Sequence, residues 1–220
     1  MAPHMESFNH FLDTLKLHPE SSRLALVDAY LLQNPNCAQA YYQRGLIHGA
    51  IYTYNKEKLV HLEYGDSDQA IADFEKAIEL DPKFVAAYAE KASLYLHLDI
   101  DDVGGAELME QALAIEPDNI ACLNLYMSLT STQGINGECI DICKKIIELQ
   151  PTAKHKYDLA ETYFYLAEEY VGVLDQESLE NLEQAILQLN VVIEEDQDEI
   201  VVKESRELLE QALELKASMA

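Results

Sequence analysis

Apolar residues recur at helical spacing along most of the chain. In the segment "QAIADFEKAIELDP", which ends at Pro82, they occupy positions i, i+4, i+7 and i+8 of one helix face: Ala70, Phe74, Ala77 and Ile78. No stretch alternates apolar and polar residues with a period of two over a useful length. The pattern therefore predicts an all-α protein.

Prolines divide the helical pattern into repeats. Pro35, Pro82, Pro117 and Pro151 are separated by 47, 35 and 34 residues. The last three close the similar segments "KAIELDP", "QALAIEP" and "KIIELQP", each an amphipathic last turn that proline stops. A fixed period of this length indicates a stack of helix pairs.

This pattern resembles the tetratricopeptide repeat (TPR) family over roughly residues 38–197. In that family a helix A carries an aromatic and a small residue, and a helix B carries a small residue, an aromatic residue and an alanine. Tyr41 and Gly45 match helix A, and Ala70, Phe74 and Ala77 match helix B. The resemblance implies a right-handed solenoid of antiparallel helix pairs.

The later repeats keep the core positions with other small or apolar residues. On the helix A segments these positions hold Tyr88, Ala92, Tyr95, Leu123, Met127, Thr130, Tyr157, Ala160 and Phe164. On the helix B segments they hold Gly105, Met109, Ala112, Cys139, Cys143, Ile146, Ala185, Leu189 and Val192. In the last repeat Gln197 replaces the closing proline.

The predicted domain organisation follows from these positions. We expect residues 1–5 to be a cloning remnant or a disordered N-terminus, and residues 6–197 to be TPR-like helical repeats. The repeats are predicted at 6–35 (degenerate), 38–84 (with an insertion), 85–119, 120–153 and 154–197 (with an insertion). Residues 198–220 are predicted to be a C-terminal capping helix with one apolar side: Val201, Leu208, Leu209, Ala212 and Leu215.

Both insertions fall at the turn between helix A and helix B. In the repeat 38–84, helix A is predicted to continue beyond Gly49, and in the last repeat helix B is predicted to start early, after Asp175. The first insertion would present an insertion surface of Tyr52, Tyr54, Leu59 and Leu62. Partner binding, self-association and simple packing are open alternatives for this surface.

Composition and charge narrow the classes of partner. The chain has 49% hydrophobic residues, 8 Gly and 6 Pro, which is typical of a folded protein. Its formal net charge of −25 disfavours binding to nucleic acid and to anionic membrane surfaces and favours basic partners. The alternative interpretation is that the acidity only keeps the protein in solution. Without a membrane span or a signal segment, we expect a soluble cytoplasmic protein, and four cysteines without a disulfide framework fit a reducing compartment.

Signatures of catalysis are absent from the sequence. There is no phosphate-binding glycine loop, GxSxG or HExxH motif, and the seven histidines lack metal-ligand spacing. We therefore expect no enzymatic activity, no metal and no cofactor. Cys139 and Cys143 could share a metal or a redox role, but their core positions favour buried thiols.

One segment offers a calcium-binding alternative. In "DIDDVGGAELME", residues 99–110, Asp99, Asp101, Gly104 and Glu110 stand at the first, third, sixth and twelfth places of a calcium loop. The fifth place, which needs an oxygen ligand, is Val103. The competing interpretation is a helix A to helix B turn with acids near the start of helix B.

The resemblance implies that helix A residues line a concave, partner-binding groove. The groove residues predicted in this way are Gln39, Tyr42, Leu46, Gly49, Ala86, Ala89, Ser93, His97, Ala121, Asn124, Ser128, Thr132, His155, Asp158, Thr162 and Tyr165. TPR co-chaperones that bind acidic C-terminal tails use a carboxylate clamp of Lys, Asn and Arg. The matching places hold Tyr42, Leu46, Glu90, Ala121 and Leu125, so no clamp is expected.

The sequence thus predicts a scaffold that binds an apolar or basic peptide or protein segment, of the adaptor or dedicated co-chaperone type. A structural subunit of a larger or self-associated complex is the alternative. A calcium-responsive binding module is a more distant one.

Overall fold

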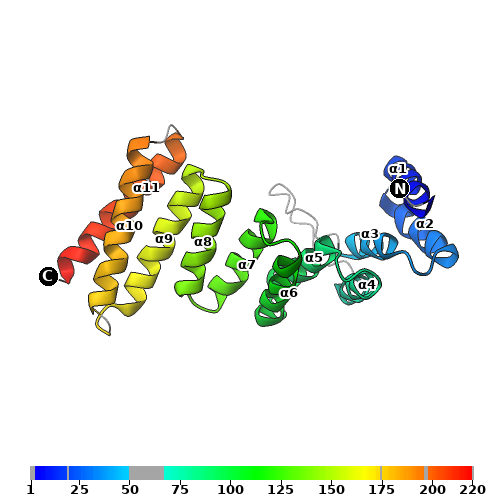
Figure 1. The fold of residues 1–220 in the computed structure, drawn as a ribbon, viewed down its shortest axis with the longest axis horizontal. Helices are drawn as coiled ribbons and strands as arrows, with labels where there is room; N and C mark the ends of the chain where they lie inside the picture. The colour runs from blue at the N-terminus through cyan, green and yellow to red at the C-terminus, as the bar shows by residue number, and fades with distance from the viewer. Residues whose placement is uncertain (1–2, 19, 50–66, 174, 196–197, 220) are drawn as a thin grey trace. The chain divides into compact units, whose positions relative to one another are not determined.

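The computed structural model describes residues 3–18, 20–49, 67–173, 175–195 and 198–219. These residues form eleven α-helices and no β-strand, which confirms the predicted all-α class (Figure 1). The chain divides into two compact units, unit 1 (Met1–Pro117) and unit 2 (Asp118–Ala220). No helix within the described ranges is both long and apolar enough to cross a bilayer.

The described residues of unit 1 form six helices. They are α1 (Pro3–Leu17), α2 (Glu20–Gln33), α3 (Ala38–His48), α4 (Ser67–Leu80), α5 (Val85–His97) and α6 (Asp102–Ile115). From α2 onward each helix packs against the next along the chain. Helix α1 includes residues 3–5, which the sequence pattern leaves outside the repeats. Its first residue is Pro3, and proline suits the start of a helix because a backbone N–H at that position would have no intrahelical acceptor.

Buried apolar side chains join the helices of unit 1, and two clusters of them lie within its described residues. Phe8, Leu15, Val27, Leu31 and Ala40 join α1, α2 and α3. Ala70, Phe74 and Leu94 join α4 to α5, and the Phe74 ring also packs against α3. A Cβ atom added to Gly45 would lie 2.6 Å from Cε1 of Phe74, so the small residue of the repeat pattern is required by the aromatic one.

A charged network crosses the same helices. Arg44 on α3 donates two hydrogen bonds to Asp73 on α4, at 2.9 Å from Nε and 2.6 Å from Nη2. Its Nη1 donates to Asp28 on α2 at 2.9 Å. The Asp73 side chain is only 6% exposed, so the bidentate pair satisfies a carboxylate that is withdrawn from water.

In the part of unit 2 that the structure describes there are five helices. They are α7 (Ile120–Thr132), α8 (Gly137–Leu149), α9 (Ala153–Tyr170), α10 (Asp175–Glu195) and α11 (Glu199–Ser218). Each packs against the next, as Figure 1 shows for α8, α9 and α10, and α11 also contacts α9. The core takes predicted repeat residues from α8, α9 and α10 together with Leu208 and Ala212 of α11. Helix α11 therefore covers the apolar side of the last hairpin.

Local signals fix the helix ends. Pro82, Pro117 and Pro151 each lie two residues beyond the end of a helix, as the sequence predicts, because the residue before proline disfavours the helical conformation. Polar side chains accept hydrogen bonds from the first free backbone amides at several helix starts in unit 2: Asn119, Asn136, Thr152 and Asp198.

The insertion in the last repeat lengthens both of its helices. Helices α9 and α10 have 18 and 21 residues, whereas α7 and α8 have 13 each. Helix α10 begins at Asp175, which confirms the predicted early start of helix B. The other insertion, with Tyr52, Tyr54, Leu59 and Leu62, lies outside the described residues, as does the predicted continuation of α3.

The calcium-loop alternative at residues 99–110 is wrong. Asp99 takes a left-handed conformation (φ 52°) that ends α5, and the amide of Ile100 bonds back to the Tyr95 carbonyl at 3.0 Å. Asp101 caps α6 by accepting from the Gly104 amide at 2.9 Å. Since α6 starts at Asp102, nine of the twelve residues are helical and no calcium loop is formed.

Candidate functional site

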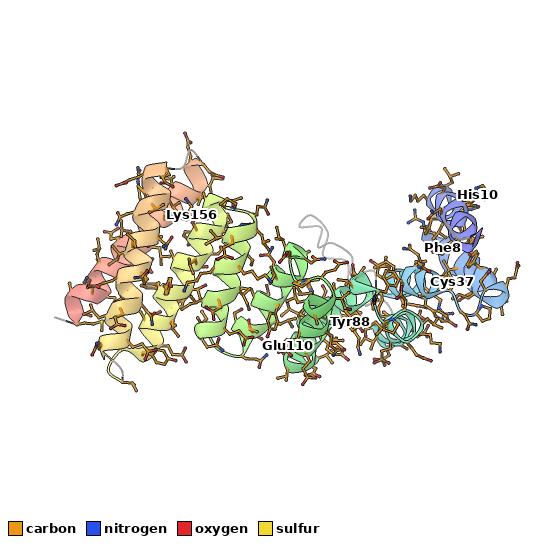
Figure 2. The ribbon with its side chains drawn as sticks, viewed as in Figure 1. Phe8, His10, Cys37, Tyr88, Glu110 and Lys156 are labelled. Atoms are coloured by element: carbon orange, nitrogen blue, oxygen red, sulfur yellow. The ribbon has the colours of Figure 1, made fainter. Side chains whose placement is uncertain are left out.

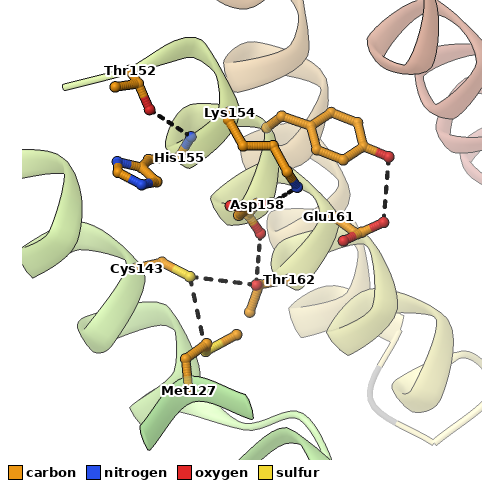
Figure 3. Close-up of polar contacts among 9 residues, drawn as sticks. Met127, Cys143, Thr152, Lys154, His155, Asp158, Glu161 and Thr162 are labelled. Atoms are coloured by element: carbon orange, nitrogen blue, oxygen red, sulfur yellow. Dashed lines mark hydrogen bonds and ion pairs between the residues drawn. The ribbon is translucent and has the colours of Figure 1, made fainter. Parts of the chain in front are cut away.

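A hollow in unit 2 gathers several of the predicted groove residues. It has a volume of about 280 Å³ and is formed by α7, α8 and α9. Its lining is Asn124, Met127, Ser128, Ser131, Cys143, Ile146, His155, Asp158, Glu161 and Thr162 (Figure 3 shows part of it). Asn124, Ser128, His155, Asp158 and Thr162 are all groove residues that the sequence predicts.

The floor of this hollow is made of neutral polar and sulfur atoms. Thr162, which is buried, donates to the Asp158 carbonyl at 2.7 Å, and its Oγ1 lies 3.6 Å from Cys143 Sγ. Met127 Sδ lies 4.0 Å from the same sulfur. Burial raises the pKa of the Cys143 thiol to about 11, so the side chain is a protonated thiol at neutral pH.

The charged groups of the lining stand on α9. Asp158 pairs with Lys154 one turn earlier, and Glu161 accepts a hydrogen bond from the Tyr157 hydroxyl at 3.3 Å. Burial raises the pKa of Glu161 and, more strongly, that of Tyr157. The adjacent His155 has its Nδ1 2.7 Å from the Gln150 carbonyl, which fixes the ring at the edge of the hollow.

Unit 1 contains a larger hollow of about 650 Å³. It is bounded by α1, α2, the α2–α3 turn, α3 and the residue before α5. Its lining is Phe8, Asn9, Leu12, Tyr30, Gln33, Asn34, Pro35, Asn36, Cys37, Gln39, Tyr42, Gln43 and Phe84. Figure 2 labels Phe8 on α1 and Cys37 at the start of α3, two sides of this hollow. Of the predicted groove residues, Gln39 and Tyr42 line it.

Two pairs of aromatic side chains line the unit 1 hollow. Tyr42 packs against Phe84 with ring centroids 4.9 Å apart, and Phe8 meets the edge of Tyr30 at 5.7 Å. Burial, with a smaller contribution from the charge of Glu90, raises the pKa of the Tyr42 hydroxyl. Burial also raises the pKa of Glu90, a half-buried carboxyl on α5.

Other predicted groove residues serve packing or helix ends instead. Leu46 packs against the core cluster of Phe74, and a Cβ added to Gly49 would lie 3.2 Å from the Ala70 Cβ. His97 Nδ1 lies 2.7 Å from the Ser93 carbonyl within α5, and neither residue lines the unit 1 hollow or the unit 2 hollow.

Two further predicted residues stand apart from the unit 2 hollow. The Thr132 hydroxyl donates to the Leu129 carbonyl at 2.7 Å near the end of α7. Tyr165 is 44% exposed and lies against Phe164 with ring centroids 5.6 Å apart. Neither side chain is part of the lining.

Solved structures share this arrangement of helices. The crystal structure of YrrB, described as a TPR protein with an unusual peptide-binding site, has a TM-score of 0.60 at 17% identity, over 91% of this chain and 89% of that one. MamA 41-end from Desulfovibrio magneticus RS-1 has a TM-score of 0.59 at 16% identity, over 86% and 94%. The chain has the tetratricopeptide-repeat fold.

A curated protein supports the same conclusion from sequence. Human tetratricopeptide repeat protein 13 is 27% identical over 119 residues, 51% of this chain. The matched part spans 14% of that protein's length. No family model matches the chain. The predicted resemblance to TPR proteins is confirmed by these similarities together.

In the repeat pattern α7 and α9 are A helices and α8 is the B helix between them, and most of the lining of the unit 2 hollow comes from the two A helices. Most residues that line the unit 1 hollow were not predicted from the sequence, because residues 6–35 match the repeat pattern poorly. Two signals could have revealed it: aromatic residues at Phe8, Phe11 and Tyr30, and the amide-rich turn "QNPNCAQ" at residues 33–39.

Proposed function

We propose that the protein is an interaction scaffold that binds a peptide or protein segment on its A-helix faces, in the manner of an adaptor or dedicated co-chaperone without a carboxylate clamp. The observation that carries this proposal is the unit 2 hollow, because predicted groove residues of α7 and α9 line it together. The peptide-binding site named for YrrB, a protein of the same fold, supports the proposal by analogy.

The chemistry of the hollow favours a basic or apolar segment. Asp158 and Glu161 are acidic, and neither Lys nor Arg is among the lining residues. Met127 and Ile146 supply apolar contact area. With a chain charge of −25, an acidic segment would be repelled both locally and at long range, whereas a basic one would be captured faster. The volume of about 280 Å³ lies near the lower end of ligand pockets and suits a single side chain with its flanking backbone.

Selection of peptides from a random display library on the immobilised full chain tests the proposal. Basic or apolar peptides should be enriched, and Ser128→Arg, which places a long cation in the hollow, should lower their affinity at least about tenfold. Ser218→Arg is the matched control, because Ser218 is exposed at the end of α11 and away from the hollow. Its affinity should equal that of the wild type.

Two results would contradict the proposal. One is the enrichment of acidic peptides, and the other is equal binding of the enriched peptides to Ser128→Arg and to the wild type. Light scattering on the isolated protein should accompany the selection. A mass well above 24.8 kDa would favour the alternative role as a self-associating subunit.

A further inference from the structure

The lining of the unit 1 hollow contains carboxamide and aromatic side chains but no charged one. The carboxamides are Asn9, Gln33, Asn34, Asn36, Gln39 and Gln43. The aromatic residues are Phe8, Tyr30, Tyr42 and Phe84. In a chain of which 25% of the residues are charged, a lining of thirteen residues without a charge is a distinct chemical environment.

The carboxamides retain capacity for hydrogen bonding. Asn34 is committed, because its Nδ2 donates to the Tyr30 carbonyl at 3.1 Å. Gln39 Oε1 accepts only from the weak Cys37 thiol, at 3.7 Å. Within the described ranges, the side chains of Gln33, Asn36 and Gln43 make no hydrogen bond. Each carboxamide offers both donors and an acceptor.

An extended peptide backbone is the complement of such a lining. It presents alternating N–H and C=O groups, and a carboxamide can donate to one and accept from the other without any charge. The aromatic rings add apolar surface for one side chain: Tyr42 and Phe84 stand at an interplanar angle of 47°, and Phe8 and Tyr30 at 64°.

Charged side chains of either sign are disfavoured in this hollow. A buried carboxylate would find no cation in the lining, and a buried ammonium or guanidinium group would find no carboxylate. The guanidinium of the neighbouring residue, Arg44, is held by Asp73 and Asp28. The hollow thus differs from that of unit 2, where two carboxylates line the wall.

We propose that the unit 1 hollow binds an extended, uncharged stretch of a partner polypeptide, with a Phe or Leu side chain between the aromatic residues and the partner's backbone on the carboxamides. The proposal deepens the proposed function, on which it rests, by assigning this site a different partner chemistry from that of unit 2. The volume of about 650 Å³ is in the range of about 300–1,000 Å³ found for ligand pockets.

Short synthetic peptides test the specificity. The probes are fluorescein-labelled, blocked at both ends, and made of Gly and Ser around one central residue, which is Phe, Leu, Lys or Glu. A further Phe probe carries N-methyl groups on the backbone. In anisotropy titrations of the full-length Ser128→Arg variant, in which the unit 2 hollow is blocked, the Phe and Leu probes should bind, while the Lys, Glu and N-methylated probes should bind at least about tenfold more weakly.

Substitutions locate the binding. The double variant Gln39→Met, Gln43→Met keeps side-chain length but removes both carboxamides, and should weaken the Phe probe about tenfold. Gln111→Met is the control, because Gln111 is exposed on α6 and bonds its own helix at the Glu107 carbonyl. Unfolding curves should show that both variants remain folded.

The proposal is overturned if the Phe probe fails to bind at millimolar concentration, if Lys or Glu probes bind equally well, or if the double variant binds like the wild type. A concentration-dependent dimer that excludes the Phe probe would assign the hollow to a second copy of the chain and would also overturn it. If these probes fail to bind, while the peptides selected from the display library bind the wild type and lose affinity in Ser128→Arg, only the unit 1 site is refuted. If the Phe probe binds, while the affinity of the library-selected peptides is unchanged by Ser128→Arg, only the unit 2 site is refuted.

Discussion

Removal of the Arg44 guanidinium should destabilise the protein more than the loss of any surface ion pair. Arg44→Met keeps the apolar stem of the side chain but withdraws the donors from both oxygens of Asp73. The Asp73 side chain, 6% exposed, would then be a charge withdrawn from water without a partner. The variant tests whether the network of α2, α3 and α4 contributes to stability or only accompanies the packing.

The expected cost is about 3 kcal/mol at neutral pH. Breaking a buried pair by removing one partner costs about 3–5 kcal/mol, and the lower end applies because the Arg44 side chain is 27% exposed. The second pair contributes less. Asp28 is 49% exposed on its side chain, so Asp28→Asn should cost below about 1 kcal/mol, and less in high salt.

Urea unfolding followed by circular dichroism measures these differences as free energies of unfolding. The double variant Arg44→Met, Asp73→Leu serves as the control, because it leaves neither charge buried and should recover most of the loss. The reasoning is refuted if Arg44→Met costs no more than Asp28→Asn. It is also refuted if the double variant is as unstable as Arg44→Met alone, because the loss would then come from packing.

Two further substitutions have predicted effects on stability. Gly45→Ala should lower the free energy of unfolding by about 1–2 kcal/mol, because the clash with Phe74 outweighs the gain of about 1 kcal/mol in helix propensity. Gly137→Ala is the control and should be neutral or stabilising, because the space around its added Cβ is open. Equal losses of stability for the two variants in thermal melts would contradict this. Burial raises the pKa of Glu90, so the folded protein binds this proton more tightly than the unfolded chain and loses stability as pH rises through the raised pKa. Glu90→Gln should therefore raise the melting temperature at pH 7, with a gain that disappears below about pH 4.5, the ordinary pKa of a glutamate side chain. A gain that persists at low pH would contradict the reasoning.

The helices and their core were predictable because the signals that specify them are local. The partners Gly45 and Phe74 occupy fixed places in a repeat, and proline ends the helices at Pro82, Pro117 and Pro151. Even the early start of α10 at Asp175 follows from the excess length of the last repeat. These features need only spacing along one helix pair.

The hollows were predictable only in part, because their shape depends on helices that meet through tertiary packing. Gly49 and Leu46 have the spacing of groove residues, yet the close approach of α4 and α5 uses them for packing. Conversely, Tyr30 and Phe84 line the unit 1 hollow although one belongs to the degenerate helix pair and the other precedes α5. Helical spacing alone does not show which neighbour a side chain meets.

The charge preference proposed for the unit 2 hollow depends mainly on α9. The floor of the unit 2 hollow is neutral, because the Cys143 thiol, with a pKa of about 11, stays protonated beside Thr162. The two carboxyls of the lining, Asp158 and Glu161, both belong to α9. Lys154 already pairs with Asp158, which leaves Glu161 as the carboxylate less neutralised by a neighbouring cation. A change of Glu161 to the isosteric Gln would thus shift preference from basic toward apolar segments while the shape of the hollow stays the same, which separates charge from fit in the proposed recognition.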